Sequence, residues 1–283
     1  MPASRLPFAA LLVLALATPA FAQQRPLVTE DPESIGEGRV LLESGLDFSS
    51  RQRFSVSGLK GNLWKFPTVG VSVGISPIAE IQIDGGLHNR LNVTSRDTGA
   101  PLASVVTATG NTTTDIEDVV IGMKIRLVGE GTERPAFAVR FATRLPNASN
   151  ESGLGTDTTD FFLSLIGGKT VQSIRIVANL GLGILADPTQ GARQNDVFTY
   201  GLSFARAVTQ AAELVGELNG HASTRTGGGF PGTESRSVMR FGGRYTHGPF
   251  RVDMGVLLGL TTVSPSLGFT AGFTYVFTAF TLP

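Results

Sequence analysis

Short segments in which apolar and polar residues alternate recur along the chain from Arg39 to Phe280. In the last of them Phe269, Phe273 and Phe277 alternate with glycine, threonine and valine. A period of two is typical of a β-strand whose two faces meet different surroundings. Counting such segments predicts an all-β chain of about twelve antiparallel strands.

The segments that join these strands alternate in length. Long polar stretches alternate with connections of about two to six residues, and the last connection, residues 262–266, departs from this order by being short. The expected long loops are residues 49–61, 90–114, 146–157, 187–196 and 223–235. Long loops on the extracellular rim, short periplasmic turns and an even strand count are typical of a transmembrane up-and-down β-barrel of the bacterial outer membrane.

The first residues predict an export signal. Arg5 gives a positive start, residues 8–17 form an apolar run, and the small residues at 20–22 precede a cleavage point. The apolar run is too short to cross a bilayer as a helix. We therefore expect three parts, namely a signal peptide (1–22), a periplasmic N-terminal segment (23–37) and an outer-membrane barrel (38–283).

The N-terminal segment lacks alternation, and two interpretations of it stand side by side. The preferred one is a frayed periplasmic tail. In the other, Arg25 and the acids Glu30, Asp31 and Glu33 dock into the lower lumen as a partial plug.

The apolar strand faces point either to lipid or to a dry core. Alternation alone also fits a soluble sandwich or a lipocalin-like barrel with its apolar face inward. However, several segments run ten residues or more, near the 9–11 that span hydrocarbon, and their apolar faces carry no charge at mid-strand. Lys65 and Arg206 fall on the apolar face but near strand ends. The pattern thus favours lipid outside and a polar lumen inside.

Antiparallel pairing predicts which lumenal charges face each other, because the two residue numbers of each facing pair add up to the same value along a regular pair of strands. If the strands on either side of the 223–235 loop pair, the facing pairs are Glu213 with Arg244, Glu217 with Arg240, and His221 with Arg236. This would place an acid–base ladder inside the barrel. The turn at 129–134 likewise brings Asp118 near Arg144 and leaves Lys124 beside Arg140 as a basic patch.

These residues form the set of candidate lumen-lining side chains. The whole set is Asp118, Lys124, Arg126, Arg140, Arg144, Arg175, Glu213, Glu217, His221, Arg236, Arg240, Arg244, Arg251 and Asp253. Such charges either brace and fill the lumen or line a constriction that sorts solutes by charge.

Composition narrows the chemistry further. The chain has no cysteine, which excludes disulfides and thiolate sites. Its 23 basic and 23 acidic residues balance, so it has no excess positive charge of the kind that binds nucleic acid. Of the three histidines, His88 and His221 point to the lumen by parity and His247 lies in a short turn. A lipid hydrolase would need a histidine beside a serine on the outer face. We expect no catalytic residue, metal site or cofactor.

Several stretches together resemble a known family. They are residues 25–45 ("RPLVTEDPESIGEGRVLLESG"), 115–127 ("DIEDVVIGMKIRL"), 140–161 ("RFATRLPNASNESGLGTDTTDF"), 213–220 ("ELVGELNG") and the aromatic last strand. This order is similar to that of the "MetA pathway of phenol degradation" family of bacterial outer-membrane transporters. The resemblance implies a small outer-membrane barrel that passes small solutes, aromatic compounds among them, and it brings no catalytic residues.

The expectation from the sequence is therefore a passive channel. Its partners would be outer-membrane lipid, a small solute and the barrel-assembly machinery that inserts it. The alternative is a closed barrel that serves as a structural or surface-loop scaffold, and a lipid hydrolase is a distant third.

Overall fold

The structure is a computed structural model that describes residues 25–225 and 230–281, so the expected signal peptide (1–22) lies outside the described residues. All the regular elements of the described part are strands. They are β1 (Arg39–Phe54), β2 (Leu59–Gly74), β3 (Ala79–Gly86), β4 (Asn89–Arg96), β5 (Thr112–Asp115), β6 (Val120–Val128), β7 (Ala136–Arg144), β8 (Asp160–Val171), β9 (Ile174–Ala186), β10 (Gln194–Ala207), β11 (Ala212–Ser223), β12 (Arg236–His247), β13 (Phe250–Gly259) and β14 (Leu267–Thr278).

The strands close into an up-and-down barrel. From β6 to β14 each strand pairs antiparallel with the next one in sequence, and β1 pairs with both β2 and β14, which closes the sheet. Strands β3 and β4 pair with the two halves of β2, and β5 pairs with β4 while β6 pairs with β3, so these four short strands form two interrupted long ones. The predicted twelve-stranded antiparallel barrel is confirmed.

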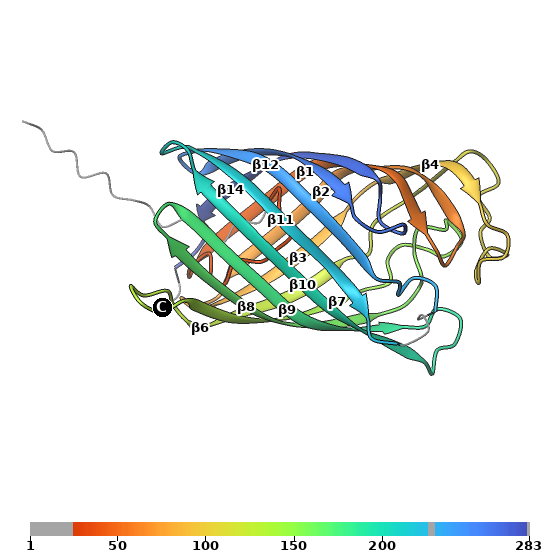
Figure 1. Ribbon diagram of the computed structural model, residues 1–283, viewed down its shortest axis with the longest axis horizontal. Coiled ribbons are helices and arrows are strands. Elements are labelled where there is room, and N and C mark those ends of the chain that lie inside the picture. Colours follow the sequence, from red (N-terminus) through yellow and green to blue (C-terminus); the bar gives the residue numbers. More distant parts are fainter. Residues whose placement is uncertain (1–24, 226–229, 282–283) are drawn as a thin grey trace, which may run out of the picture.

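The two ends of the barrel differ, as Figure 1 shows. At one end, which we call the short-turn end, β1 begins beside the last residues of β14, with Arg39 facing Thr278. The turns at 75–78, 129–135, 172–173, 208–211 and 248–249 lie at this end. The opposite, long-loop end carries the connections at 97–111, 145–159, 187–193 and 260–266, together with residues 224–225 and 230–235 between β11 and β12.

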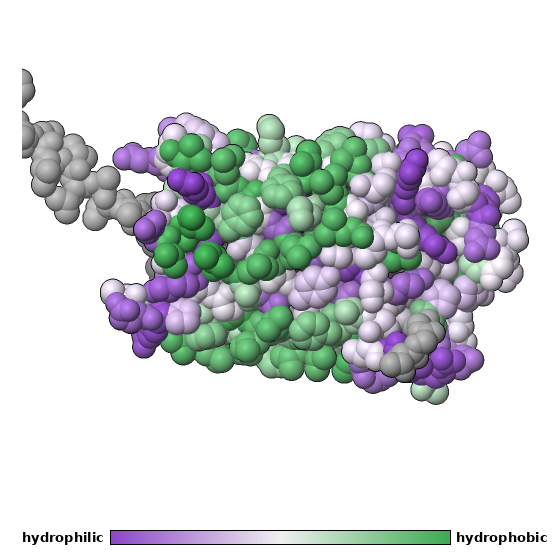
Figure 2. All heavy atoms as spheres, viewed as in Figure 1, coloured by the Kyte–Doolittle hydropathy of each residue, from purple (hydrophilic) through white to green (hydrophobic). Residues whose placement is uncertain are grey.

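Apolar side chains face outward. Leu180, Leu214, Met254 and Phe273 are each about half exposed or more, at 53%, 59%, 68% and 48%. On the face drawn in Figure 2, apolar residues cover much of the cylinder wall and polar residues gather at both ends. The outward direction predicted for the apolar face is confirmed, and the interpretation as a soluble barrel with a dry core is wrong.

Among the described residues, no helix is long and apolar enough to cross a membrane.

A local irregularity overturns two predicted side-chain directions. The β1–β2 register shifts by one residue between the Gly45 and Asp47 pairs, so the face of β2 reverses, and Lys65 pairs with the lumenal Glu117 instead of lying on the apolar face. Opposite this point the chain is interrupted between β3 and β4, and His88 is exposed instead of lumenal. One extra residue exchanges the two faces of a strand because the side-chain period is two.

The first expected long loop is also shorter than predicted. Strand β1 continues to Phe54 and β2 begins at Leu59, so residues 55–58 alone make the turn. Most of residues 49–61 therefore extend the hairpin, because they keep pairing after the clear alternation ends. In β8, Phe161 faces outward, at 53% exposed, whereas Phe162 faces the interior, where it lines a cavity together with Asn179.

Candidate lumenal site

Residues 25–36 lie inside the barrel; we call them the inner segment. These residues contact strands around almost the whole circumference of the interior wall, between the short-turn end and the middle of the barrel. In order along the chain they are Arg25 with Thr68 and Thr270, Val28 and Thr29 with Glu217, Glu30 with Asn179, Asp31 with Arg175, Glu33 with Arg126, and Ile35 with Glu80. The preferred expectation of a frayed tail is therefore wrong for these residues, because charges and backbone groups that a tail would leave in water have partners on the wall.

Glu217 of β11 holds the centre of the inner segment. Both its carboxylate oxygens accept from the Val28 N–H at 3.0 Å, and one accepts from the Thr29 N–H at 2.8 Å and from the Thr29 Oγ1 hydroxyl at 2.7 Å. Arg240 of β12 donates to the other oxygen at 2.6 Å, and the Glu217 side chain is fully buried. A carboxylate can accept this many hydrogen bonds, whereas a neutral amide cannot.

Glu30 lies between the two cations for which a basic patch was predicted. The facing of Lys124 and Arg140 is confirmed. However, Glu30 Oε1 lies 3.1 Å from Arg140 Nε and Glu30 Oε2 lies 3.5 Å from Lys124 Nζ, while Glu80 Oε1 lies 3.0 Å from the same ammonium. The prediction of a basic patch is wrong, since both cations are neutralised by acids from the inner segment and from β3.

Two further ion pairs fix the inner segment near the short-turn end. Arg175 of β9 donates to both oxygens of Asp31, at 2.9 and 2.8 Å, and also to Glu130 in the β6–β7 turn at 2.5 Å. Burial raises the pKa of Glu130, but the Thr170 N–H and the Arg175 charge outweigh it and hold that pKa below its ordinary value. Arg126 of β6 pairs with Glu33.

The predicted ladder between β11 and β12 has the predicted register. Arg244 donates to Glu213 at 2.6 Å, as Arg240 does to Glu217. The third facing pair differs in chemistry, because its two side chains turn to backbone carbonyls. His221 Nε2 lies 2.9 Å from the Glu234 carbonyl, and Arg236 donates to the Arg53 carbonyl at 3.3 Å.

The remaining candidates also lie inside the barrel. Arg144 lies 3.8 Å from Asp118, as predicted, and it also pairs with Asp160. Arg251 and Asp253 of β13 are buried, and Arg25 Nε lies 3.6 Å from Asp253. All fourteen candidates are thus interior, but four are too deeply buried to meet a solute in this conformation, namely Lys124, Glu217, Arg251 and Asp253.

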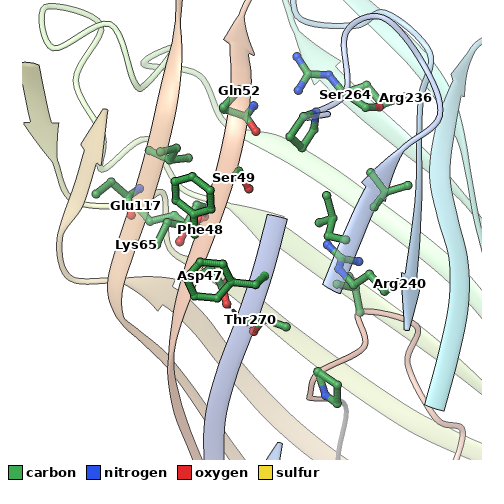
Figure 3. A pocket seen from close by; sticks show the side chains of 18 of the residues that line it. Asp47, Phe48, Ser49, Gln52, Lys65, Glu117, Arg236, Arg240, Ser264 and Thr270 are labelled. Atoms are coloured by element: carbon green, nitrogen blue, oxygen red, sulfur yellow. Dashed lines mark hydrogen bonds and ion pairs between the residues drawn. The ribbon is translucent and has the colours of Figure 1, made fainter. Parts of the chain in front are cut away.

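A cavity of about 470 Å³ lies on the long-loop side of the inner segment. Arg25, Pro26, Leu27 and Val28 form its floor, and its walls combine charged residues with apolar ones such as Leu257. Figure 3 shows Arg236 and Arg240 on one side of the space, with Gln52, Phe48 and Lys65 on the other. A second cavity of about 290 Å³ adjoins it toward the loops, and the two share Gln52, Phe54, Asp118, Arg144, Leu154 and Arg236.

The short-turn half of the interior is filled with side chains. Leu41, Glu80, Lys124, Ile166 and Thr274 are each at most 2% exposed. Ile35 of the inner segment packs with Leu41 and Val276, and Leu27 packs with Ala205 and Val215. The interior therefore resembles a cup, with space on the long-loop side and a packed floor.

Several interior residues that matter here were not among the candidates. Glu80, Gln82, Asn179 and Asp160 are hydrogen-bonded partners of the inner segment or of the candidate arginines. The alternation already placed Gln82 and Asn179 on the polar face, so parity was the signal for them. Within the described residues, no group of three or more His, Cys, Asp or Glu side chains could hold a metal ion.

Several solved structures are similar to this chain. The COG4313 outer membrane channel from Pseudomonas putida F1 has a TM-score of 0.61 and 11% sequence identity, over 87% of this chain and 98% of that one. The translocator domain of the autotransporter NalP from Neisseria meningitidis has a TM-score of 0.48 and 13% identity, over 84% and 87%. The Pseudomonas putida toluene transporter TodX has a TM-score of 0.41 and 10% identity, over 88% and 92%.

No curated protein matches the sequence. The sequence does match one family, over residues 24–277, which is nearly the whole of the barrel and the inner segment together. The resemblance noted from the sequence is confirmed: the chain belongs to the family described as "Putative MetA-pathway of phenol degradation".

Proposed function

We propose that this protein is a channel of the bacterial outer membrane that passes small solutes, with aromatic compounds among them. The observation that carries the proposal is a cavity of about 470 Å³, lined by charged and apolar side chains, inside a barrel whose outer face is apolar. A lumen of this size and mixed character suits a small amphipathic molecule better than a large hydrophilic one. Family membership supports the same class of protein.

In this proposal the inner segment sets the rate of passage. It lies between the cavity and the packed short-turn half, so a solute that has entered the cavity from the long-loop side must pass Arg25 to Val28 to go further. Transport then requires that the inner segment, or part of it, leave the wall. Its ion pairs stabilise the closed state, and because there are several of them, we expect the channel to open only briefly.

Planar-bilayer recording tests the proposal. The full chain should give rare openings, and a variant that lacks residues 25–35 should give a several-fold larger and more continuous conductance. A solute-uptake assay with phenol in liposomes should follow the same order. Equal conductance from both proteins would contradict a gating inner segment.

The packed short-turn half favours one second candidate, a closed barrel that acts as a scaffold for its loops. This candidate predicts electrical silence from both proteins, provided that they have folded and inserted.

A further inference from the structure

The cavity near the loops has an uneven balance of charge. Three arginines, Arg53, Arg144 and Arg236, line the 290 Å³ cavity, and the one acid among its lining residues is Asp118. Asp118 and Asp160 both pair with Arg144, which accounts for that cation. Of the other two arginines, Arg53 comes from β1 and Arg236 from β12, and Arg236 also lines the larger cavity.

Arg236 is weakly compensated by nearby acids. Its guanidinium donates to the Arg53 carbonyl at 3.3 Å, and among the described residues the structure gives it no ion pair with a carboxylate. Glu234 lies near enough to add some negative potential, but its carboxylate accepts from the Gly232 N–H at 2.9 Å. By contrast, Arg240, four residues further along β12, donates hydrogen bonds to Glu217 at 2.6 Å and to Asn219 at 2.9 Å.

The rest of the cavity wall combines apolar side chains with polar ones such as Thr199 and His221. Phe54, Leu154, Phe162 and Val197 line it together with the arginines. Gln52 lies across the larger cavity from Arg236 and offers an amide at its mouth (Figure 3). An arginine binds a carboxylate in a bidentate manner, and apolar walls take an attached ring or chain.

We propose that Arg236, with Arg53 beside it, forms an entry site for small carboxylates that carry an aromatic or otherwise apolar body. The carboxylate would replace the long contact between Arg236 and the Arg53 carbonyl, and the apolar body would lie against Phe54 and Leu154. This inference rests on the proposed passage of small solutes and names the chemical class that the loop-side cavity selects. It concerns the approach from the long-loop side and is independent of how the inner segment moves.

The test compares four probes on the full-length protein in detergent, with isothermal titration calorimetry as the readout. Benzoate carries both features, benzyl alcohol keeps the ring without the charge, acetate keeps the charge without the ring, and benzylamine reverses the charge. Benzoate should bind at least about tenfold more tightly than each of the others, since a hydrogen bond to a charged group is worth roughly one to two powers of ten. Equal binding of benzoate and benzyl alcohol, or of benzoate and acetate, would overturn the inference.

Variants locate the site. Arg236→Gln should weaken benzoate binding about ten- to hundredfold and leave benzyl alcohol binding unchanged, because it removes the charge that the ring alone does not use. Arg236→Lys, which keeps the charge but loses the planar fork, should fall between the two. Arg206→Gln is the matched control, since it removes an arginine that is exposed at the end of β10. An equal loss in the Arg206 variant would overturn the assignment.

Failure of this inference and failure of the proposed function give different results. If phenol uptake and conductance are present but benzoate has no preference, the entry site is wrong and the channel stands. If conductance is absent from the full chain and from the variant lacking residues 25–35, the channel itself is wrong. Heat-modified migration on a gel shows in each case that the barrel has folded.

Discussion

Replacing Glu217 with glutamine should release the centre of the inner segment. In the native chain the buried carboxylate accepts from two backbone N–H groups, a hydroxyl and Arg240. Glutamine keeps one acceptor oxygen, turns an NH₂ group toward donors, and leaves Arg240 without its counter-charge. Breaking a buried ion pair costs about 3–5 kcal/mol, and we take the lower end because one hydrogen bond can survive. About 3 kcal/mol corresponds to a roughly hundredfold shift toward the released state.

Amide hydrogen exchange measures this shift directly, because the N–H groups of Val28 and Thr29 both bond to Glu217. Their protection in Glu217→Gln should fall about a hundredfold, and openings in planar bilayers should become more frequent. The matched control is Glu213→Gln, which breaks the neighbouring Arg244 pair in the same ladder. Val28 and Thr29 should keep their protection there. A change of less than about threefold in Glu217→Gln would refute the role of Glu217 as the anchor.

Three other outcomes are expected. Gly201→Val should displace Thr29 from the wall, because a Cβ at position 201 would lie 2.8 Å from Thr29 Oγ1. Conductance should then rise while the barrel still folds. Unchanged conductance would show that β10 shifts to accommodate the valine and Thr29 stays in place. Leu180→Arg, at the middle of β9 on the apolar face, should cost about 2–4 kcal/mol in urea unfolding in lipid, whereas Val208→Arg in the β10–β11 turn should cost about 0–1 kcal/mol; similar costs would argue against a lipid-facing band. The pairing of Glu130 should depend on pH: its pKa is lowered on folding, so its contribution is complete above the ordinary value of 4.5 and is lost as the pH falls through the lowered value. Protection of the Thr170 amide should therefore decline only below pH 4.5 and should be low at every pH in Glu130→Gln; a decline centred near neutral pH would contradict this.

The strand count, the outward apolar face and the β11–β12 register could all be predicted from the sequence. Each of these follows from a local rule, namely the period of two and the constant index sum of facing residues. Glu217 and Arg240 were therefore paired correctly from their numbers alone. Such rules hold only while a strand remains regular, which is why the shift near Gly45 misplaced Lys65 and His88.

The course of the inner segment could not be predicted in the same way. Its residues have no alternation, and their partners are far away in the chain, since Arg25 and Thr270 are separated by 245 positions. Arg25, Glu30, Asp31 and Glu33 showed which charges could dock but not where. The charge of the lumen depends on this docking, because Glu30 cancels the cations that the sequence left as a basic patch.

The position of Arg25 also has a consequence for the order of assembly. Its guanidinium contacts Thr68 of β2 and Thr270 of β14, with Asp47 of β1 at 3.6 Å, so it bridges from within the junction where the first and last strands meet. These partners come together only when the final strand has joined the first. Arg25 can therefore complete its contacts only at the end of barrel formation, and these contacts then stabilise the closed junction.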